Sequence, residues 1–158
     1  MKRVGYNGDL VNLYKVRTMH PFSEFLQDYL YSHTQLDRSG KFRDDFRIAT
    51  WGRLFRRLWI DEMPQLLNLY RGQIKLFGVR AISQHYFSLY PPDLQELRIQ
   101  TKPGLVPPYY KDLPKSFEEI CESERKYLES YFKHPFRTDW KYFWGAMYNI
   151  VVKRVRSK

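Results

Sequence analysis

The sequence predicts an α+β fold that is predominantly helical and contains a few short strands. Several segments place apolar residues at helical spacing, strand-like alternation is confined to short stretches, and Pro or Gly residues separate the segments. At 158 residues the chain has the length of one domain and is long enough to bury a substantial core. We therefore interpret residues 1–158 as a single domain.

The N-terminal elements follow from turn and cap signals. Gly5-Tyr-Asn-Gly8 is a turn signal, and residues 10–16 alternate as a strand does, so we expect a short hairpin. Ser23 is placed to cap a short helix that runs to about residue 31, with Glu24 in its first turn.

Two helices are expected next, after a polar connector over residues 39–45. Thr50 is placed to cap the first, over residues 51–58, which carries an apolar stripe. Asp61 is a candidate N-cap of the second, with Glu62 in its first turn, where Pro64 is tolerated because early N–H groups have no intrahelical partner. Gly72 is a natural stop. We expect the apolar residues of this second helix to form its buried face, namely Leu66, Leu67, Leu69 and Tyr70.

The following segment predicts a strand, a turn and a loop. Residues 74–77 read as a strand, and Gly78 permits a tight turn that presents Arg80. Pro91-Pro92 begin a helix that runs to about Arg98. Residues 101–110 hold too many Pro and Gly residues for a regular element and predict a stiff, aromatic-lined loop.

Two longer helices complete the chain. Ser116 and Glu119 match a capping box for a helix over residues 117–132. A final helix over residues 138–155 is apolar on several sides and ends in basic residues. This pattern fits docking at an anionic membrane interface, and equally a core helix whose terminal cations complement its dipole.

The charge balance favours anionic partners. Lys and Arg number 27 against 17 Asp and Glu, so the formal net charge is +10. Phosphates, nucleic acid or an acidic membrane surface would match this excess, whereas net charge by itself also fits a soluble protein with a basic face. The lone Cys121 lies among glutamates, which argues against a nucleophilic thiol. The four histidines lack metal-ligand spacing, and no phosphate-binding loop or dinucleotide fingerprint is present.

Asp61-Glu62 is the strongest candidate for chemistry. Carboxylates serve as nucleophiles in phosphoryl transfer, and Mg²⁺ typically binds one or two carboxylates together with substrate phosphates. Asp61 could therefore attack a phosphoryl group while Glu62 holds a divalent ion, and Arg56, Arg57 and Arg80 could neutralise a diphosphate. The local alternative is that Asp61 simply caps a helix.

In their order along the chain, these segments resemble the bacterial sugar transferase family, the monotopic polyprenyl-phosphate phosphoglycosyltransferases. The most specific match is Asp-Glu-x-Pro-Gln at residues 61–65 with the downstream Lys-Pro-Gly at residues 102–104. The remaining matching segments are residues 3–8, 14–19, 46–57 and 60–68, Gly72, and residues 78–80.

The resemblance implies a compact monotopic domain with amphipathic interfacial helices on the cytoplasmic face of the inner membrane. Such a domain transfers a phospho-sugar from a nucleotide sugar, expected to be a UDP-sugar, to polyprenyl phosphate, and so initiates an exopolysaccharide or a lipopolysaccharide. Asp61 would form the covalent intermediate, Glu62 with Asp61 would hold Mg²⁺, and the phosphate-binding cations would be Arg56, Arg80, Arg57 and Lys102. A homo-oligomer is an open alternative.

Three departures from the family pattern leave one rival interpretation, and the net charge with the many aromatic residues leaves another. Gln73 stands where the family usually has an acid, Val79 and Ala81 stand where prolines are common, and family members carry a hydrophobic membrane helix before this domain. A catalytically inactive remnant that binds a membrane or a complex is the first rival. A nucleic-acid-binding module is the second, but no known binding motif supports it, so we expect no nucleic-acid partner.

Overall fold

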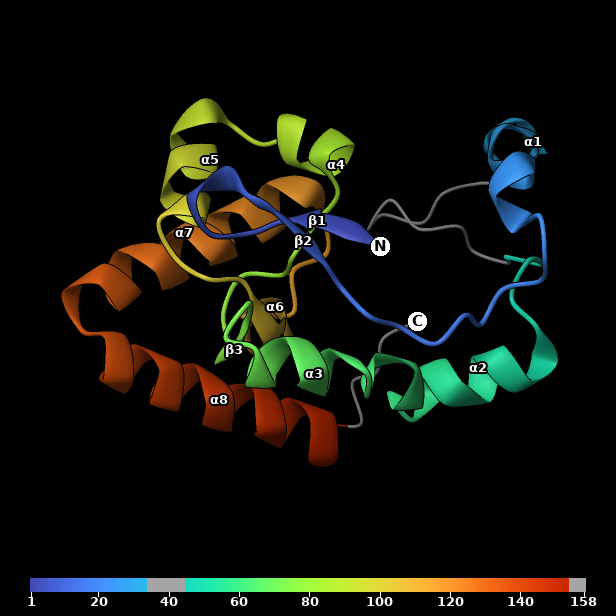
Figure 1. Ribbon diagram of the computed structural model, residues 1–158. Coiled ribbons are helices and arrows are strands. Elements are labelled where there is room, and N and C mark those ends of the chain that lie inside the picture. Colours follow the sequence, from blue (N-terminus) through green and yellow to red (C-terminus); the bar gives the residue numbers. More distant parts are fainter. Residues whose placement is uncertain (34–44, 154–158) are drawn as a thin grey trace.

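The computed structural model describes residues 1–33 and 45–153 and confirms a predominantly helical α+β fold (Figure 1). The connector predicted over residues 39–45 lies almost wholly outside these residues. The α-helices are α1 (Gln27–His33), α2 (Thr50–Arg57), α3 (Gln65–Tyr70), α4 (Gln84–Ser88), α5 (Pro92–Ile99), α6 (Tyr109–Asp112), α7 (Phe117–Lys133) and α8 (Pro135–Val151). Short 3₁₀ helices are η1 (Tyr6–Gly8), η2 (Ser23–Leu26) and η3 (Ile60–Glu62).

The strands form two small sheets. β1 (Lys2–Val4) pairs antiparallel with β2 (Leu10–Asn12), which confirms the predicted hairpin, although its second strand is shorter than residues 10–16. β3 (Lys75–Phe77) pairs in parallel with β4 (Gly104–Val106). Residues 101–110 were predicted to be an irregular loop, and this is wrong because they contain β4 and the start of α6. Proline is compatible with both elements: the Pro103 carbonyl accepts from Lys75, and Pro108 precedes α6, where no intrahelical donor is needed.

The two glycines of this sheet allow a close approach between backbones. A Cβ atom on Gly104 would lie 2.1 Å from the backbone nitrogen of Gly78. The Gly104 amide donates to the carbonyl of Val79 at 2.8 Å, and Arg80 forms a further bridge with Gly104. Gly78 was predicted to make a turn, but it serves to bring β3 and β4 together so that Arg80 follows directly from the paired strands.

The core lies where α5, α7 and α8 pack around β3 and α6. Leu94, Leu128 and Ala146 are completely buried there. The predicted start of α7 is confirmed, because Ser116 Oγ accepts from the Glu119 amide at 3.2 Å. Cys121 is buried in α7, where burial, followed by the charge of Glu124, raises the pKa of its thiol, as expected for a structural residue.

Other helix boundaries differ from the predictions in instructive ways. Thr50 is the first residue of α2, and Ala49 occupies the cap position without a side-chain hydrogen bond. Ser23 lies inside η2, with Glu24 in the first turn as predicted. The helix from Pro92 is confirmed, whereas α4 was missed. α8 begins three residues earlier than predicted and ends at Val151, whereas the prediction continued through residues 152 and 153; its last two residues, 154 and 155, lie outside the described part of the chain.

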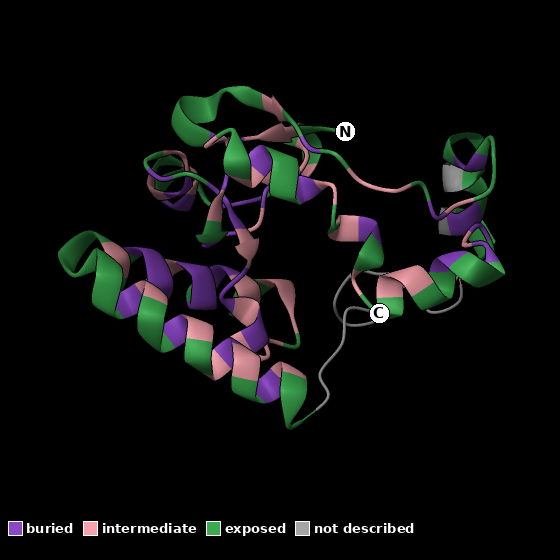
Figure 2. Cartoon of the chain, turned by 60° about the horizontal axis from the view of Figure 1, so that its bottom comes forward, coloured by how far each residue is buried: buried purple, intermediate pink, exposed green. Residues whose placement is uncertain are grey.

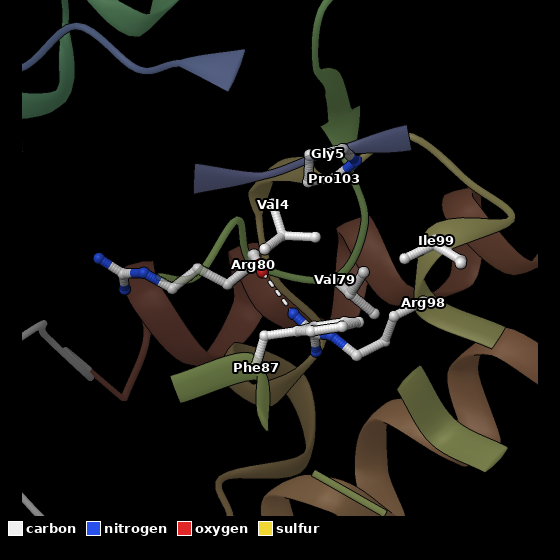
Figure 3. Close-up of a pocket in the computed structure, with 8 residues that line it drawn as sticks. All are labelled: Val4, Gly5, Val79, Arg80, Phe87, Arg98, Ile99 and Pro103. Carbon is white, nitrogen blue, oxygen red and sulfur yellow. Dashed lines mark hydrogen bonds between the residues drawn. The ribbon is translucent and has the colours of Figure 1, made fainter. Parts of the chain in front are cut away.

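A buried ion pair holds α5 to α7 beneath the sheet. Arg98 and Glu124 form it with exposed fractions of 5% and 1%, and the Arg98 guanidinium stacks over Tyr90 at 4.6 Å. Arg98 Nη2 also donates to the backbone carbonyl of Arg80 at 2.6 Å (Figure 3). In this view the side chain of Arg80 extends away from Arg98. The ion pair therefore supports the backbone from which Arg80 projects.

The burial of α3 differs from the prediction at most positions. The helix buries Gln65 and Asn68, and it exposes three of the four apolar side chains that we expected inside, with Leu66, Leu67 and Tyr70 at 45%, 44% and 89%. Only Leu69 is partly buried as expected, against a small apolar cluster. Asn68 explains the inversion because its side-chain amide bonds the chain at the C-terminal end of β2: Oδ1 accepts from the Tyr14 amide at 3.1 Å, and Nδ2 donates to the Asn12 carbonyl at 2.8 Å. The polar side chains of α3 therefore attach this helix to the rest of the fold.

Two other helices expose apolar faces in the same way (Figure 2). On α8, exposed apolar side chains recur at nearly every fourth residue, while the opposite face is buried. α2 buries Gly52 and leaves its apolar residues outside. These helices and α3 lie along the lower edge of the molecule in Figure 1. The exposed residues are Trp51 and Leu54 of α2 with Leu58 directly after it, and Phe136, Trp140, Trp144, Tyr148 and Val151 of α8.

Among residues 1–33 and 45–153, no helix combines the length and the hydrophobicity needed to cross a bilayer.

Candidate active site

The carboxylate pair lies in a short 3₁₀ turn between α2 and α3. Asp61 is therefore not the N-cap of α3, a position taken by Pro64, so the predicted interaction of Asp61 with that helix N-terminus is wrong. Instead, Trp59 adopts a left-handed conformation with φ of 60° and turns the chain sharply. This conformation is strained for a bulky residue and requires support from its surroundings, which the packing of Trp59 on Tyr110 provides at 5.2 Å.

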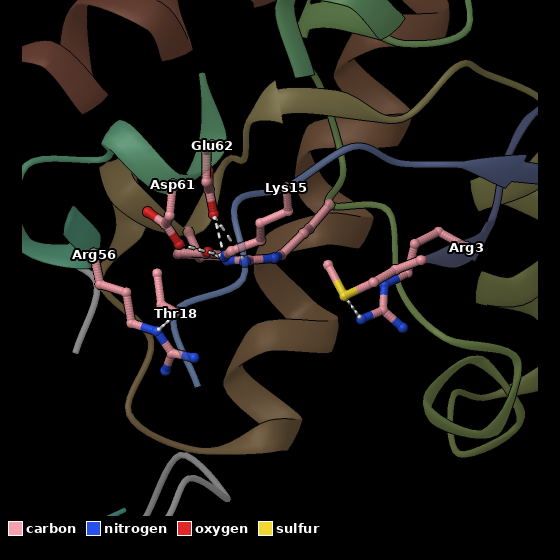
Figure 4. A network of polar contacts seen from close by, with 9 residues as sticks. Arg3, Lys15, Thr18, Arg56, Asp61 and Glu62 are labelled. Atoms are coloured by element: carbon pink, nitrogen blue, oxygen red, sulfur yellow. Dashed lines mark hydrogen bonds and ion pairs between the residues drawn. The ribbon is translucent and has the colours of Figure 1, made fainter. Parts of the chain in front are cut away.

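Lys15 joins the two carboxylates (Figure 4). Its Nζ lies 2.8 Å from Asp61 Oδ2 and 3.3 Å from Glu62 Oε1. The side chain of Asp61 is 2% exposed and that of Glu62 is 22% exposed. The backbone supports this arrangement, because the Val16 amide donates to the Asp61 carbonyl at 2.9 Å. Segments about 45 residues apart are thus brought together around one buried carboxylate.

Arg80 lies on the other side of Glu62. Its Nη2 is 3.3 Å from Glu62 Oε1, and its Nη1 donates to the Tyr109 hydroxyl oxygen at 2.5 Å. The oxygen of Tyr109 and, more weakly, the Glu62 carboxylate raise the pKa of Arg80 above its ordinary value, against the lowering effect of burial. Arg80 is therefore a permanent cation beside the carboxylates, as the sequence predicted.

Arg56 reaches the site from α2. Its Nε donates to Thr18 Oγ1 at 2.8 Å (Figure 4). Burial lowers the pKa of Arg56, and the charges of Asp61 and Asp45 oppose this shift. The guanidinium thus lies within electrostatic range of Asp61 without being joined to it in an ion pair among the described residues.

The other two predicted phosphate-binding residues lie outside this cluster. Arg57 and Lys102 are exposed, and within the described parts of the chain no ion pair joins either residue to Asp61 or Glu62. The ammonium of Lys102 lies beside Gly72 instead. Arg57 follows Arg56 on a helix whose successive residues point in different directions, so only one of the two arginines can face the carboxylates.

The donor set fits a magnesium ion. Mg²⁺ prefers hard oxygen ligands and usually binds one or two protein carboxylates, with phosphates and water completing its shell. In the described residues, Asp61 Oδ1 and Glu62 Oε2 have no ion-pair partner, since Lys15 and Arg80 engage the other oxygen of each group. No larger cluster of His, Cys, Asp and Glu occurs in these residues, so an ion here would depend on this pair and on its substrate.

Sequence reasoning missed Lys15, Thr18 and Tyr109 as members of the site. Lys15 and Thr18 lie in the segment over residues 14–19 that carries part of the family resemblance, which was the available signal. Tyr109 lies in the stretch that was interpreted as an irregular loop, and no signal marked it. Gln73 is one of the departures from the family pattern. Its Oε1 accepts from Asn68 Nδ2 at 2.6 Å, so Gln73 makes a structural hydrogen bond at a position where the family usually has an acid.

The sequence is similar to known proteins of one family. The bacterial sugar transferase family matches residues 1–153. The chain is 31% identical over 110 residues to the exopolysaccharide production protein ExoY of Sinorhizobium fredii. It is 31% identical over 110 residues to the undecaprenyl-phosphate galactose phosphotransferase of Salmonella typhimurium. It is 33% identical over 106 residues to the UDP-glucose:undecaprenyl-phosphate glucose-1-phosphate transferase of Caulobacter vibrioides.

These alignments cover 66% of this chain in each case, and 48%, 23% and 36% of the three relatives. The chain thus spans about half the length of these curated relatives, or less. With the match of the family over residues 1–153, the chain belongs to the bacterial sugar transferase family.

Proposed function

We propose that this chain transfers a phospho-sugar from a nucleotide sugar, expected to be a UDP-sugar, to a polyprenyl phosphate. One observation carries the proposal: Asp61 is a buried carboxylate that lies near two cations, Lys15 and Arg56, and a third cation, Arg80, pairs with the adjacent Glu62. Such a site favours an approaching anion, because charges act strongly where water is excluded. The relatives named as undecaprenyl-phosphate sugar transferases support the same reaction class.

The reaction proceeds in two steps. An Asp61 carboxylate oxygen attacks the phosphorus atom that carries the sugar, and the bond to the nucleoside monophosphate breaks with its electron pair leaving on the nucleotide. A phosphate oxygen of the polyprenyl phosphate then attacks the same phosphorus and releases Asp61. Arg80 and Arg56 hold the diphosphate by charge and hydrogen bonding. When bound at Asp61 and Glu62, Mg²⁺ supplies charge neutralisation for the phosphates.

The direct test is nucleoside monophosphate release from a panel of UDP-sugars with Mg²⁺ and undecaprenyl phosphate. The acceptor should be supplied in phosphatidylglycerol vesicles, so that the chain meets it at a membrane surface. We expect release with one or a few of the donors, and this outcome also identifies the sugar. No release from any donor by folded protein would favour the non-catalytic binding remnant instead.

Lys15→Met should lower the rate of release by about 10²-fold, the scale found when one preorganised charge partner is removed. Without Lys15, the adjacent carboxylates of Asp61 and Glu62 repel each other and the incoming phosphates. Steady-state kinetics with the preferred donor would measure the loss, and circular dichroism would confirm the fold. A rate equal to that of the unaltered chain would contradict a role for Lys15 in the site.

We further propose that the exposed faces of α2, α3 and α8 lie on the cytoplasmic surface of an anionic membrane. Interfacial helices combine an outward apolar face with aromatic and basic residues, and that is the pattern here. Trp140 and Trp144 project from α8, and exposed Arg53 and Arg57 flank the apolar face of α2. This gives Arg57 a role at lipid phosphates.

Trp144→Ser should weaken binding to vesicles that contain phosphatidylglycerol by about tenfold or more, because a buried indole contributes more than 1.4 kcal/mol of transfer free energy. Leu89→Ser is the matched control. Leu89 is 53% exposed against 54% for Trp144, but it ends α4 at the opposite edge of the molecule (Figure 1). Co-sedimentation with vesicles measures both variants. Equal losses would overturn this orientation, and a loss of self-association instead would assign the face to a homo-oligomer.

A further inference from the structure

We propose that an apolar cavity beside Glu62 holds the first isoprene unit of the polyprenyl phosphate acceptor, an inference that rests on the proposed function. The cavity has a volume of about 120 Å³. Its walls come from three parts of the fold: Trp59 and the start of α3, Leu105 and Val106 of β4, and Tyr110 of α6.

The polar end of the cavity is the catalytic site itself. Glu62 lines the cavity, and its carboxylate pairs with Lys15 and Arg80. A polyprenyl phosphate carries its negative charge at the end of a hydrocarbon chain. Its phosphate group can therefore lie on these cations while the adjacent carbon atoms enter the apolar part of the cavity.

Two of the residues that line the cavity are also exposed on the molecular surface. Met63 and Leu66 both line it, and they are 58% and 45% exposed. These residues belong to the apolar face that we propose to lie on the membrane. An isoprenoid chain could thus pass from the bilayer to the carboxylates along continuous apolar surface, without its hydrocarbon crossing water.

The chemistry of the cavity favours hydrocarbon over the nucleoside of the donor. A cavity of about 150 Å³ lined by apolar side chains can bind benzene, so a five-carbon isoprene unit is of a suitable size here. A nucleobase brings several polar atoms, and burying these without hydrogen-bond partners costs free energy. Glu62 is the one charged residue among those that line the cavity.

The test fills the cavity and compares the result with a matched control. Leu66→Trp places an indole at the cavity, whereas Leu67→Trp places one on the next residue of α3, which is 44% exposed and does not line the cavity. Both variants therefore present an added indole on the same helix at nearly the same exposure. The acceptor is undecaprenyl phosphate in phosphatidylglycerol vesicles, with the donor that the UDP-sugar panel identifies.

Two measurements distinguish a failure of the inference about the cavity from a failure of the proposed function. The first is the burst of nucleoside monophosphate without acceptor, which reports attack by Asp61. The second is kcat/KM for undecaprenyl phosphate. We expect equal bursts from the two variants, and a kcat/KM about tenfold lower for Leu66→Trp than for Leu67→Trp, as for the loss of a buried group of a few carbon atoms.

Each other outcome counts against the inference. Equal kcat/KM values in the two variants would show that the acceptor does not use the cavity. A burst that is slowed in Leu66→Trp would assign the cavity to the donor. A chain without any burst would refute the proposed function, and the inference would fall with it.

Discussion

Asp61→Asn should abolish nucleoside monophosphate release, with a loss of about 10⁴-fold or more, the scale found when a catalytic nucleophile is removed. An amide has nearly the shape of a carboxylate but cannot form the phospho-sugar intermediate. Intact-mass measurement after mixing with the donor should show the covalent adduct in the unaltered chain and none in the variant.

Asp139→Asn is the matched control for this substitution. Asp139 pairs with Lys75 at 3.5 Å much as Asp61 pairs with Lys15, and it also accepts from the Tyr127 hydroxyl at 2.6 Å. The variant should lose some stability but keep the adduct, because this network lies in the packing of α8 on β3 rather than at the carboxylate pair. An adduct that persists in Asp61→Asn would refute Asp61 as the nucleophile.

Arg98→Met should destabilise the fold by about 3–5 kcal/mol, because it leaves Glu124 charged and unpaired in the interior. The free energy of unfolding of a typical single domain is about 5–15 kcal/mol, so this loss is a large part of it. Burial raises the pKa of Glu124, and the charge of Arg98 opposes the shift, so loss of Arg98 also favours uptake of a proton by Glu124. Urea denaturation followed by circular dichroism would measure the loss.

The double variant Arg98→Met with Glu124→Met distinguishes the effect of Arg98 on the stability of the fold from its effect on the position of Arg80. Replacing both charges with apolar side chains removes the unpaired charge and should restore most of the free energy of unfolding. The hydrogen bond to the Arg80 carbonyl is still missing, so KM for the donor should rise while the fold remains stable. A double variant with an unchanged KM would show that Arg98 does not position Arg80.

The sequence predicted the grouping of the charged residues more reliably than the burial of each helix. Adjacent carboxylates and arginines can be read from residue types, and Asp61, Glu62, Arg56 and Arg80 do converge in the structure. The buried face of α3 was assigned wrongly because apolar residues were assumed to face inward. That rule holds for a protein surrounded by water, whereas Gln65 and Asn68 face the interior here.

Contacts between distant segments were the part that could not be predicted. Lys15 meets Glu62 across 47 residues, and nothing local to either residue specifies that contact. β4 was missed for a similar reason, since three residues between prolines have little propensity of their own and become a strand because β3 supplies the partner. Tyr109 entered the site as a result, because β4 positions the helix that carries it.

The contact between Gly78 and Gly104 limits how this protein can vary. Neither glycine touches a carboxylate, yet a methyl group on either one would force the two strands apart, since backbone atoms of one lie within 3.0 Å of a Cβ placed on the other. Arg80 follows Gly78 by two residues and bridges to Gly104, so the separation would reach the guanidinium. The absence of a side chain at these two positions therefore helps to keep Arg80 beside Glu62, although it contributes no functional group.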